Sequence, residues 1–396
     1  MSAEKKILSV ESIRGWACFM VLLSHLSLTF YPYLHAFDGE AQFGEYPIQH
    51  FIHESPFGFF FSGTSAVFIF FVLSSYILTK VALKDNNIAE RVYLMGLKRY
   101  PRLMIPALAS CLIAFLAIAL FDITSPQLSD WINGYGNNGT YSAVGAIYSG
   151  AIDVFFLSGR SSYNPVLWTM KIELLGSFIV YLLCLNRATL NIPFLTGFAF
   201  LLTASLMLLG MLEPNLALGF MSFYGGYLFG IYGSKISTKL SLVLIVSGLY
   251  LAGAHNSSSS YAFIHFFLGD YTYKLCNFIS GFLIVYAIIF NDGLNRIFSG
   301  RLSVFMGKVS FSVYLVHMPI LSTFGVFLFN AAYKATGIYD LAAIISSISS
   351  IIMVYFVSLY FYKHIDSKAM TISNRFAKYV LGRFHTFNKA IQRTSR

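Results

Sequence analysis

Charged residues are scarce in this sequence. Asp, Glu, Lys and Arg together make up only 11% of its 396 residues, while 57% are hydrophobic. With a mean hydropathy of +0.67, this composition excludes an ordinary soluble globular domain. It predicts an all-α, polytopic integral membrane protein, because helices satisfy their own backbone hydrogen bonds in lipid. Acidic residues are the scarcer sign, at 17 against 27 basic residues. We attribute the excess to cytoplasmic loops and expect no binding of nucleic acid.

Cysteines and internal repeats are also few or absent. The four cysteines are Cys18, Cys111, Cys184 and Cys276, and all fall in apolar runs without the paired spacing of a metal or redox site. We therefore expect buried core thiols and no metal. No repeat of 20–50 residues and no matching halves are present, which disfavours many secondary transporter architectures.

Long apolar runs dominate what remains. Crossing a bilayer takes roughly 20 mostly apolar residues, and ten such runs lie near 12–31, 57–79, 103–121, 167–185, 192–212, 218–233, 240–254, 276–290, 309–329 and 340–362. With a cytoplasmic N-terminus, the inner connections and tail hold 23 Lys and Arg and the outer connections hold three. This bias predicts about ten transmembrane helices with both termini cytoplasmic.

Two segments fall outside this pattern. Residues 143–158 are apolar but short and contain Asp153; a crossing there would place the basic C-terminus outside, so we expect a re-entrant or interfacial helix. After a membrane domain at 1–362, the tail at 363–396 has eight Lys and Arg and a single acid, Asp366. A basic amphipathic helix on the anionic cytoplasmic leaflet is expected, with a partly disordered anchor as the alternative.

Ionisable side chains within the apolar runs are the first candidates for a site, since such groups usually face a cavity or a partner. Arg14 and His25 are 11 residues apart, which leaves them about 20° apart around a helix and about 16 Å apart along it. His317 lies in a later run, with Ser310 on nearly the same helix face. Glu173 lies roughly 9 Å below the predicted outer surface, near His25 in depth. For each of these residues taken alone, the alternative to a functional role is a histidine that only packs in the core or an arginine that extends to the membrane surface.

Two further groups lie at the predicted membrane surfaces. Arg99 and Arg102 precede the third run at a spacing of three, and paired guanidinium groups suit phosphate oxygens. They could equally be a topogenic signal. On the outer side, Trp131, Tyr135 and Tyr141 lie among amides and hydroxyls in a composition compatible with stacking on sugars, although interfacial aromatics are common.

Five stretches occur in the order typical of one family: "ESIRGWACFMVLLSH", "FIFFVLSSYI", "KRYPRLMIP", "LWTMKIE" and "GKVSFSVYLVHMP". The sequence resembles the acyltransferase type 3 family of integral-membrane O-acyltransferases, and we expect no extracytoplasmic esterase-like domain of the kind that some members carry. Ser75 stands where the family usually has glycine. The resemblance implies transfer of acetyl from acetyl-CoA to a hydroxyl of a cell-surface glycan such as an exopolysaccharide, or of a lipid-linked sugar, in the plasma or inner membrane.

The resemblance also carries roles to particular residues. His25 is expected to act as general base with Glu173 or His317 orienting it or the acceptor, because a neutral imidazole suits this task near pH 7. CoA phosphates are assigned to Arg14, Arg99 and Arg102, and acceptor contacts to Trp131, Tyr135, Tyr141, Ser310 and Tyr314. Two alternatives stay open: transfer of another acyl group such as succinyl, and a proton-coupled transporter that uses His25, Glu173 and His317 as a relay.

Overall fold

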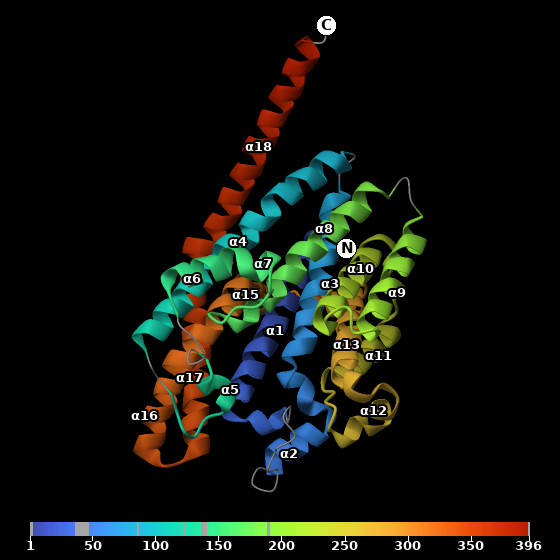
Figure 1. Cartoon of the computed structure of the whole chain (residues 1–396). Coiled ribbons are helices and arrows are strands. Elements are labelled where there is room, and N and C mark those ends of the chain that lie inside the picture. Colours follow the sequence, from blue (N-terminus) through green and yellow to red (C-terminus); the bar gives the residue numbers. More distant parts are fainter. Residues whose placement is uncertain are drawn as a thin grey trace.

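The computed structural model describes residues 3–35, 47–84, 87–121, 124–135, 141–187 and 191–394, and every regular element within these ranges is helical. The α-helices form one bundle (Figure 1). They are α1 (Ala3–Phe30), α2 (Pro47–Glu54), α3 (Gly63–Ala82), α4 (Ile88–Leu120), α5 (Asp130–Asn133), α6 (Ala143–Tyr148), α7 (Val154–Phe156), α8 (Thr169–Leu185), α9 (Ile192–Leu208), α10 (Pro214–Tyr232), α11 (Thr238–Ala252), α12 (Ala262–Leu268), α13 (Thr272–Ile289), α14 (Asp292–Ile297), α15 (Arg301–Ile320), α16 (Val326–Thr336), α17 (Tyr339–Phe361) and α18 (Ser367–Thr394).

Short helical turns connect or interrupt these helices. Five are 3₁₀ turns: η1 (Pro32–Leu34), η3 (Pro56–Phe61), η5 (Pro165–Trp168), η6 (Ser259–Tyr261) and η7 (Gly269–Tyr271). Three are π-helical: η4 (Ser149–Asp153), η8 (Leu321–Gly325) and η9 (Tyr362–Asp366). The turn η8 follows Pro319, whose ring cannot donate a backbone hydrogen bond, so the helix changes its pitch there.

The helices agree with a polytopic membrane protein. By length and composition, seven helices of the described ranges could cross a membrane, and three shorter apolar ones accompany them: Ala143–Phe156, Ile192–Leu208 and Thr238–Ala252. Each of the ten apolar runs in the sequence coincides with a helix. The all-α class is therefore confirmed, while the number of crossings and the side of each terminus stay predictions.

The first and the fifteenth helix cross at two glycines. A β-carbon on Gly15 of α1 would lie 2.6 Å from the backbone nitrogen of Gly307 on α15, and one on Gly307 would overlap the carbonyl oxygen of Glu11. Small residues at a crossing let two backbones approach closely, which replaces the missing hydrophobic driving force between helices in lipid. This crossing brings the two ends of the membrane domain together.

The segment at 143–158 is helical and packs on α4. The Tyr100 hydroxyl donates to the carbonyl oxygen of Ala151 at 2.6 Å. A β-carbon on Gly150 would lie 2.6 Å from Cα of Leu108, so this contact is also backbone to backbone. The apolar helix here is shorter than a span, in keeping with the expected re-entrant or interfacial segment, whose membrane position stays a prediction.

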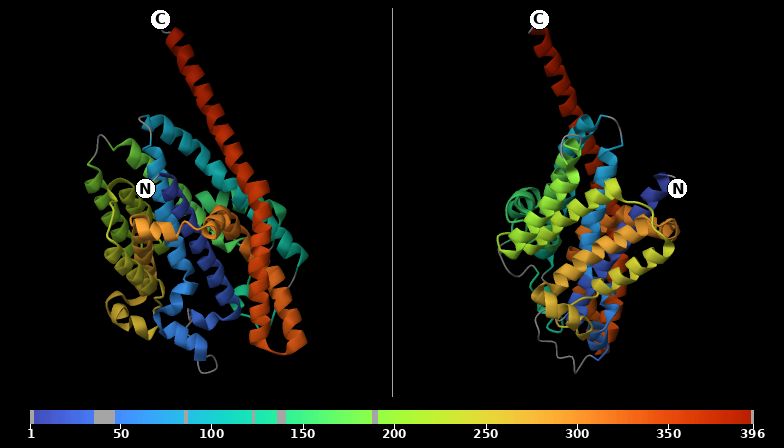
Figure 2. Two further views of the ribbon diagram at one scale, coloured as in Figure 1. Left: turned by 180° about the vertical axis from the view of Figure 1, so that it is seen from behind. Right: turned by 90° about the vertical axis from the view of Figure 1, so that its right-hand side faces the viewer.

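The C-terminal segment continues the last long helix. The turn η9 joins α17 to α18, and α18 packs beside α4 before it projects past the bundle (Figure 2). A helix therefore occupies the basic tail from Ser367 to Thr394. Its expected contact with the lipid leaflet stays a prediction.

The glycine crossing can be tested by adding one methyl group. Gly307→Ala should lower thermal stability, because α1 and α15 must separate to admit the methyl group; overpacking typically costs about 1–3 kcal/mol. Gly197→Ala in α9 is the matched control, since its β-carbon would meet nothing within 4 Å. That variant should be neutral or slightly stabilising. Equal melting temperatures for the two variants would contradict the crossing.

Candidate active site

Two histidines from the crossing helices form the centre of the site. Nδ1 of His25 on α1 lies 2.7 Å from Nε2 of His317 on α15. The rings are nearly parallel, at 9°. His317 is 1% exposed. The close approach of α1 and α15 therefore places two imidazoles in hydrogen-bond contact although they are 292 residues apart in sequence.

The hydrogen bonds assign a proton to each histidine. Nδ1 of His317 lies 3.0 Å from the carbonyl oxygen of Val313, which can only accept, so this nitrogen carries the proton. In the neutral ring Nε2 of His317 is then the acceptor, and Nδ1 of His25 must donate to it. This series of hydrogen bonds leaves the free lone pair of the His25 ring on Nε2. This arrangement orients an imidazole to accept a proton from a third group.

An aromatic residue also stacks on His25. Trp131 on α5 stacks on the His25 ring at 5.3 Å between centroids, and it is 38% exposed. The preceding Ser129 ties α5 to α1, because its hydroxyl donates to the carbonyl oxygen of Leu28 at 2.7 Å. Trp131 is thus a partly exposed aromatic ring in direct contact with His25.

Two more of the predicted acceptor aromatics, Tyr135 and Tyr141, pack elsewhere. The Tyr135 hydroxyl donates to the carbonyl oxygen of Tyr163 at 2.6 Å, and the Tyr141 ring meets the Tyr163 ring edge-on at 5.3 Å. The structure thus brings Trp131 to the histidine pair and groups the two tyrosines around Tyr163.

The three predicted donor-binding arginines meet at one cavity. It has a volume of about 280 Å³ and includes Arg14, Arg99 and Arg102 in its lining. The rest of the lining is mainly apolar and aromatic, with a few hydroxyls and one carboxylate, and it includes Phe70, Phe71, Ser74, Thr169, Met170, Glu173, Ser310, Phe311 and Tyr314. Guanidinium groups at an otherwise apolar cavity suit a ligand with an anionic end and an uncharged end.

Arg99 is held by a network from α3 and α8. Its Nε donates to the Ser177 hydroxyl at 2.7 Å, and its Nη2 contacts the Glu173 carboxylate at 2.5 Å. The Ser74 hydroxyl donates to the same carboxylate at 2.9 Å. Side chains of Arg99 and Glu173 are 15% and 14% exposed. Among the residues that the structure describes, the hydrogen bonds of Arg99 use Nε and Nη2, so Nη1 remains available to a ligand.

The other two arginines also have carboxylate partners. Arg14 lies 3.4 Å from Glu11, one turn earlier on α1. Arg102 pairs with Asp366 of the turn η9. Each cationic side chain of the cavity is thus balanced by a nearby acid, which offsets the cost of placing it among apolar helices.

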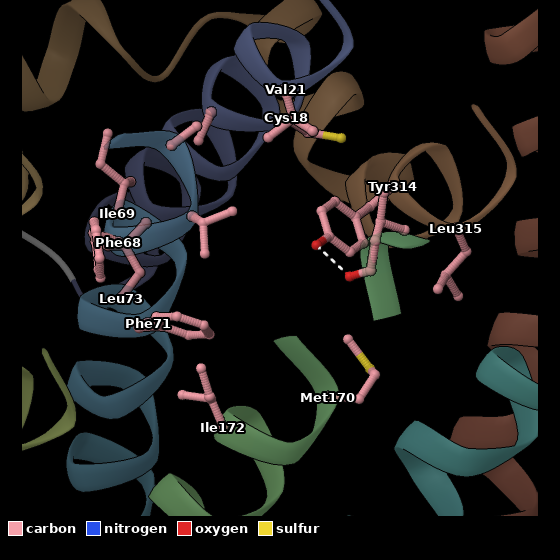
Figure 3. Close-up of a cluster of buried hydrophobic side chains, with 14 of the residues drawn as sticks. Cys18, Val21, Phe68, Ile69, Phe71, Leu73, Met170, Ile172, Tyr314 and Leu315 are labelled. Atoms are coloured by element: carbon pink, nitrogen blue, oxygen red, sulfur yellow. Dashed lines mark hydrogen bonds between the residues drawn. The ribbon is translucent and has the colours of Figure 1, made fainter. Parts of the chain in front are cut away.

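Tyr314 separates the cavity from the histidine pair. It lines the cavity, and its ring centroid lies 6.0 Å from that of His317. Its hydroxyl donates to the carbonyl oxygen of Val166 at 2.7 Å and lies 3.1 Å from the Thr169 hydroxyl. Figure 3 shows Tyr314 and Phe71 pointing toward one another from α15 and α3. Ser310, one turn before Tyr314, also lines the cavity.

The structure differs from the sequence-based depths of Glu173 and Arg99. We expected Glu173 near His25 and Arg99 at the opposite mouth, yet the two side chains are in contact. Helix α4 begins at Ile88, so Arg99 lies 11 residues inside this helix, or about 16 Å, and not at its start. The side chain in hydrogen-bond contact with the His25 ring is His317, and Glu173 instead belongs to the arginine network.

Several site residues escaped the sequence analysis. Ser74 and Ser177 hold Arg99, and Asp366 holds Arg102. Only Asp366 had a signal, as the single acid of a basic tail. The unusual Ser75 lies away from the cavity, where its hydroxyl donates to the carbonyl oxygen of Phe223 at 2.5 Å. This departure from the family pattern therefore affects the packing of α3 on α10.

A second, smaller cavity of about 110 Å³ includes His35 and His255 in its lining, beyond the end of α1. Ring centroids of His35 and His53 lie 5.8 and 5.1 Å from that of His255. Burial, followed by repulsion from neighbouring histidines, lowers the pKa of His35 to about 3, and the same causes lower the pKa of His255 to about 4. This cluster is packed in its neutral form.

Comparison with known proteins identifies the chain. The family model described as an acyltransferase domain matches residues 7–363, which is most of the chain. Comparisons with curated proteins and with solved structures gave no match. The match includes every predicted site residue and ends three residues before Asp366.

The arginine network predicts a specific pattern of stabilities. Arg99→Ala should lower stability strongly, by about 3–5 kcal/mol, because it leaves the Glu173 carboxylate buried without its cation. The double variant Arg99→Ala, Glu173→Gln should recover part of that loss in thermal unfolding of the purified protein. Lys235→Ala is the control, because its ion pair with Asp292 is exposed and contributes about 0–1 kcal/mol. A double variant no more stable than Arg99→Ala would argue against the network.

The histidine cluster predicts a loss of stability in acid. Below about pH 6.5 the unfolded chain binds protons at these histidines and the folded chain does not, so stability should fall toward pH 4 by up to about 1.4 kcal/mol per pH unit for each histidine. His255→Gln should make the fall in melting temperature between pH 7 and 4.5 less steep. A slope unchanged in this variant would show that His255 contributes nothing to acid sensitivity.

Proposed function

The chain belongs to the acyltransferase type 3 family and is a membrane acyltransferase, and from this premise we propose that it transfers acetyl from acetyl-CoA to a hydroxyl of a saccharide. The observation that carries the proposal is the hydrogen-bond chain from Val313 through His317 to His25, which leaves Nε2 of His25 as an acceptor. Tyr314 lines the arginine-containing cavity and lies beside His317, so the oriented base is close to this cavity. O-acyl transfer needs a general base in such a position.

The cavity is the proposed site of the acyl donor. Arg14, Arg99 and Arg102 would hold the phosphates of CoA through charge-assisted hydrogen bonds, and the apolar lining beside Phe71 and Tyr314 suits the uncharged acyl-pantetheine end. Arg99 and Arg102 each use only part of the guanidinium group on their carboxylates. This leaves donors on the same groups for a ligand.

The reaction follows from the position of the base. The acceptor hydroxyl gives its proton to Nε2 of His25 as its oxygen attacks the thioester carbonyl carbon, and the carbon–sulfur bond then breaks. The proton passes to the leaving thiolate, so the products are the ester and CoA thiol, and His25 returns to its starting form. His317 holds the tautomer throughout and stabilises the imidazolium while it exists.

The acceptor is proposed to enter from the side of Trp131. This ring stacks on His25 and remains partly exposed, and an aromatic face of this kind suits the apolar face of a sugar. Donor and acceptor would then approach from opposite sides and meet inside the bundle. A lipid-linked sugar or a surface polysaccharide, modified at the plasma or inner membrane, fits this geometry.

The family membership favours an enzyme over the proton-coupled transporter. Transfer of a succinyl group on the same scaffold remains the alternative for the donor, and mass analysis distinguishes it. Surface glycans from cells with and without the gene should differ by an acetyl-sized mass. A succinyl-sized difference would identify succinyl-CoA as the donor and leave the mechanism unchanged. An unchanged glycan profile would overturn the proposal of a saccharide acceptor.

The histidine pair can be tested by matched substitutions. His25→Ala should reduce acetyl transfer about 10²- to 10⁴-fold, because the general base is lost. His317→Leu should reduce transfer more than His317→Gln, since glutamine keeps an acceptor for Nδ1 of His25 and leucine does not. Expression and acetyl-CoA binding should persist in all three. Near-normal turnover of His25→Gln, which keeps a polar group without a base, would retire the assignment of His25.

A further inference from the structure

One ion pair connects the donor cavity to the C-terminal helix. A guanidinium nitrogen of Arg102 on α4 contacts the carboxylate of Asp366, which is 264 residues later in the sequence. The Asp366 side chain is only 3% exposed, whereas that of Arg102 is 25% exposed and lines the cavity. The acid is therefore buried behind the arginine, and the arginine faces the space assigned to the donor.

The turn that carries Asp366 is fastened on two sides. Lys308 on α15 lies over the Tyr362 ring at 5.3 Å, and α18 begins directly after the turn and packs on α4. The Phe311 ring lies 5.4 Å from the Arg102 guanidinium, so α15 also borders this arginine. Arg102 is thus held between an acid from the C-terminal turn and an aromatic ring from α15.

The two arginines of the R-x-x-R pair are held in parallel ways. Glu173 holds Arg99 from α8, and Asp366 holds Arg102 from η9. In neither pair is the carboxylate side chain more exposed than the arginine side chain. Part of each guanidinium group stays available to a ligand. A side chain as mobile as arginine loses rotamer freedom on binding a phosphate, and an acid that holds it beforehand reduces this cost.

We propose that Asp366 is a positioning residue of the donor site, which holds Arg102 in the orientation that binds a phosphate of the acyl donor. Through this residue the turn η9, which leads into the C-terminal helix, is part of the donor site, although Asp366 lies beyond the residues matched by the family model. The proposal rests on the proposed function of the cavity as the donor site.

The test measures the affinity of the purified full-length protein for radiolabelled acetyl-CoA. Asp366→Asn, which keeps the shape of the side chain and removes its charge, should weaken binding about tenfold. Asp366→Glu should restore most of the affinity. Asp292→Asn is the control, because it makes the same change in an exposed ion pair away from the cavity and should leave the affinity unchanged.

A second arm separates positioning from general stability. In an Arg102→Lys background, which lacks the planar fork, Asp366→Asn should weaken binding much less than in the wild type, because both changes act on one contact. Unchanged affinity of Asp366→Asn with a lowered melting temperature would make the pair purely structural and overturn the proposal. Tighter binding by Asp366→Asn would overturn it too, since the acid would then compete with the donor.

The outcomes also distinguish this inference from the donor assignment on which it rests. If the cavity does not bind the donor, the wild type will not bind acetyl-CoA or Arg102→Lys will bind it normally. If only the present inference fails, the wild type will bind, Arg102→Lys will bind weakly, and Asp366→Asn will bind like the wild type.

Discussion

The close crossing of α1 and α15 is the contact on which the rest of the site depends. Gly15 and Gly307 let the two backbones touch, and each glycine is next to, or one turn away from, residues of the proposed site. Arg14 precedes the first glycine, and Ser310 follows the second by one turn. Farther along the same two helices, His25 and His317 meet. A wider crossing would separate the histidines and open the cavity at once.

Buried charge explains why the bundle carries its acids where it does. A guanidinium group among apolar helices is costly unless an acid or a ligand accompanies it. Glu11, Glu173 and Asp366 provide these partners for the three arginines of the cavity. Each pair uses only part of its guanidinium group, so the cavity can be stable and still bind an anion. In the proposed site, the same carboxylates that stabilise the arginines also orient them.

The sequence predicted the helices well and the contacts between them less well. Apolar runs of sufficient length decide where helices form, and the 100° rotation per residue placed Arg14 and His25 on one face, which matches their positions at the cavity and the histidine pair. Which helix lies beside α4 cannot be read from periodicity. For this reason the partners Glu173 for Arg99 and Asp366 for Arg102 emerged only from the structure. The tautomer of His25 was equally hidden, because it depends on a carbonyl oxygen of α15.

The helix α15 contributes residues both to the cavity and to the histidine pair. Ser310, Tyr314 and His317 are spaced by four and three residues, so they lie within about 60° of one face. Ser310 and Tyr314 line the cavity, and His317 holds the base. The Tyr314 ring between them is tied at its hydroxyl to Val166, just before α8, the helix that also supplies Glu173 to the arginine network. Any shift of α15 along its axis would therefore move part of the cavity wall and His317 together, relative to His25 on α1. In the proposed reaction, donor binding and activation of the acceptor would therefore be linked through this one helix.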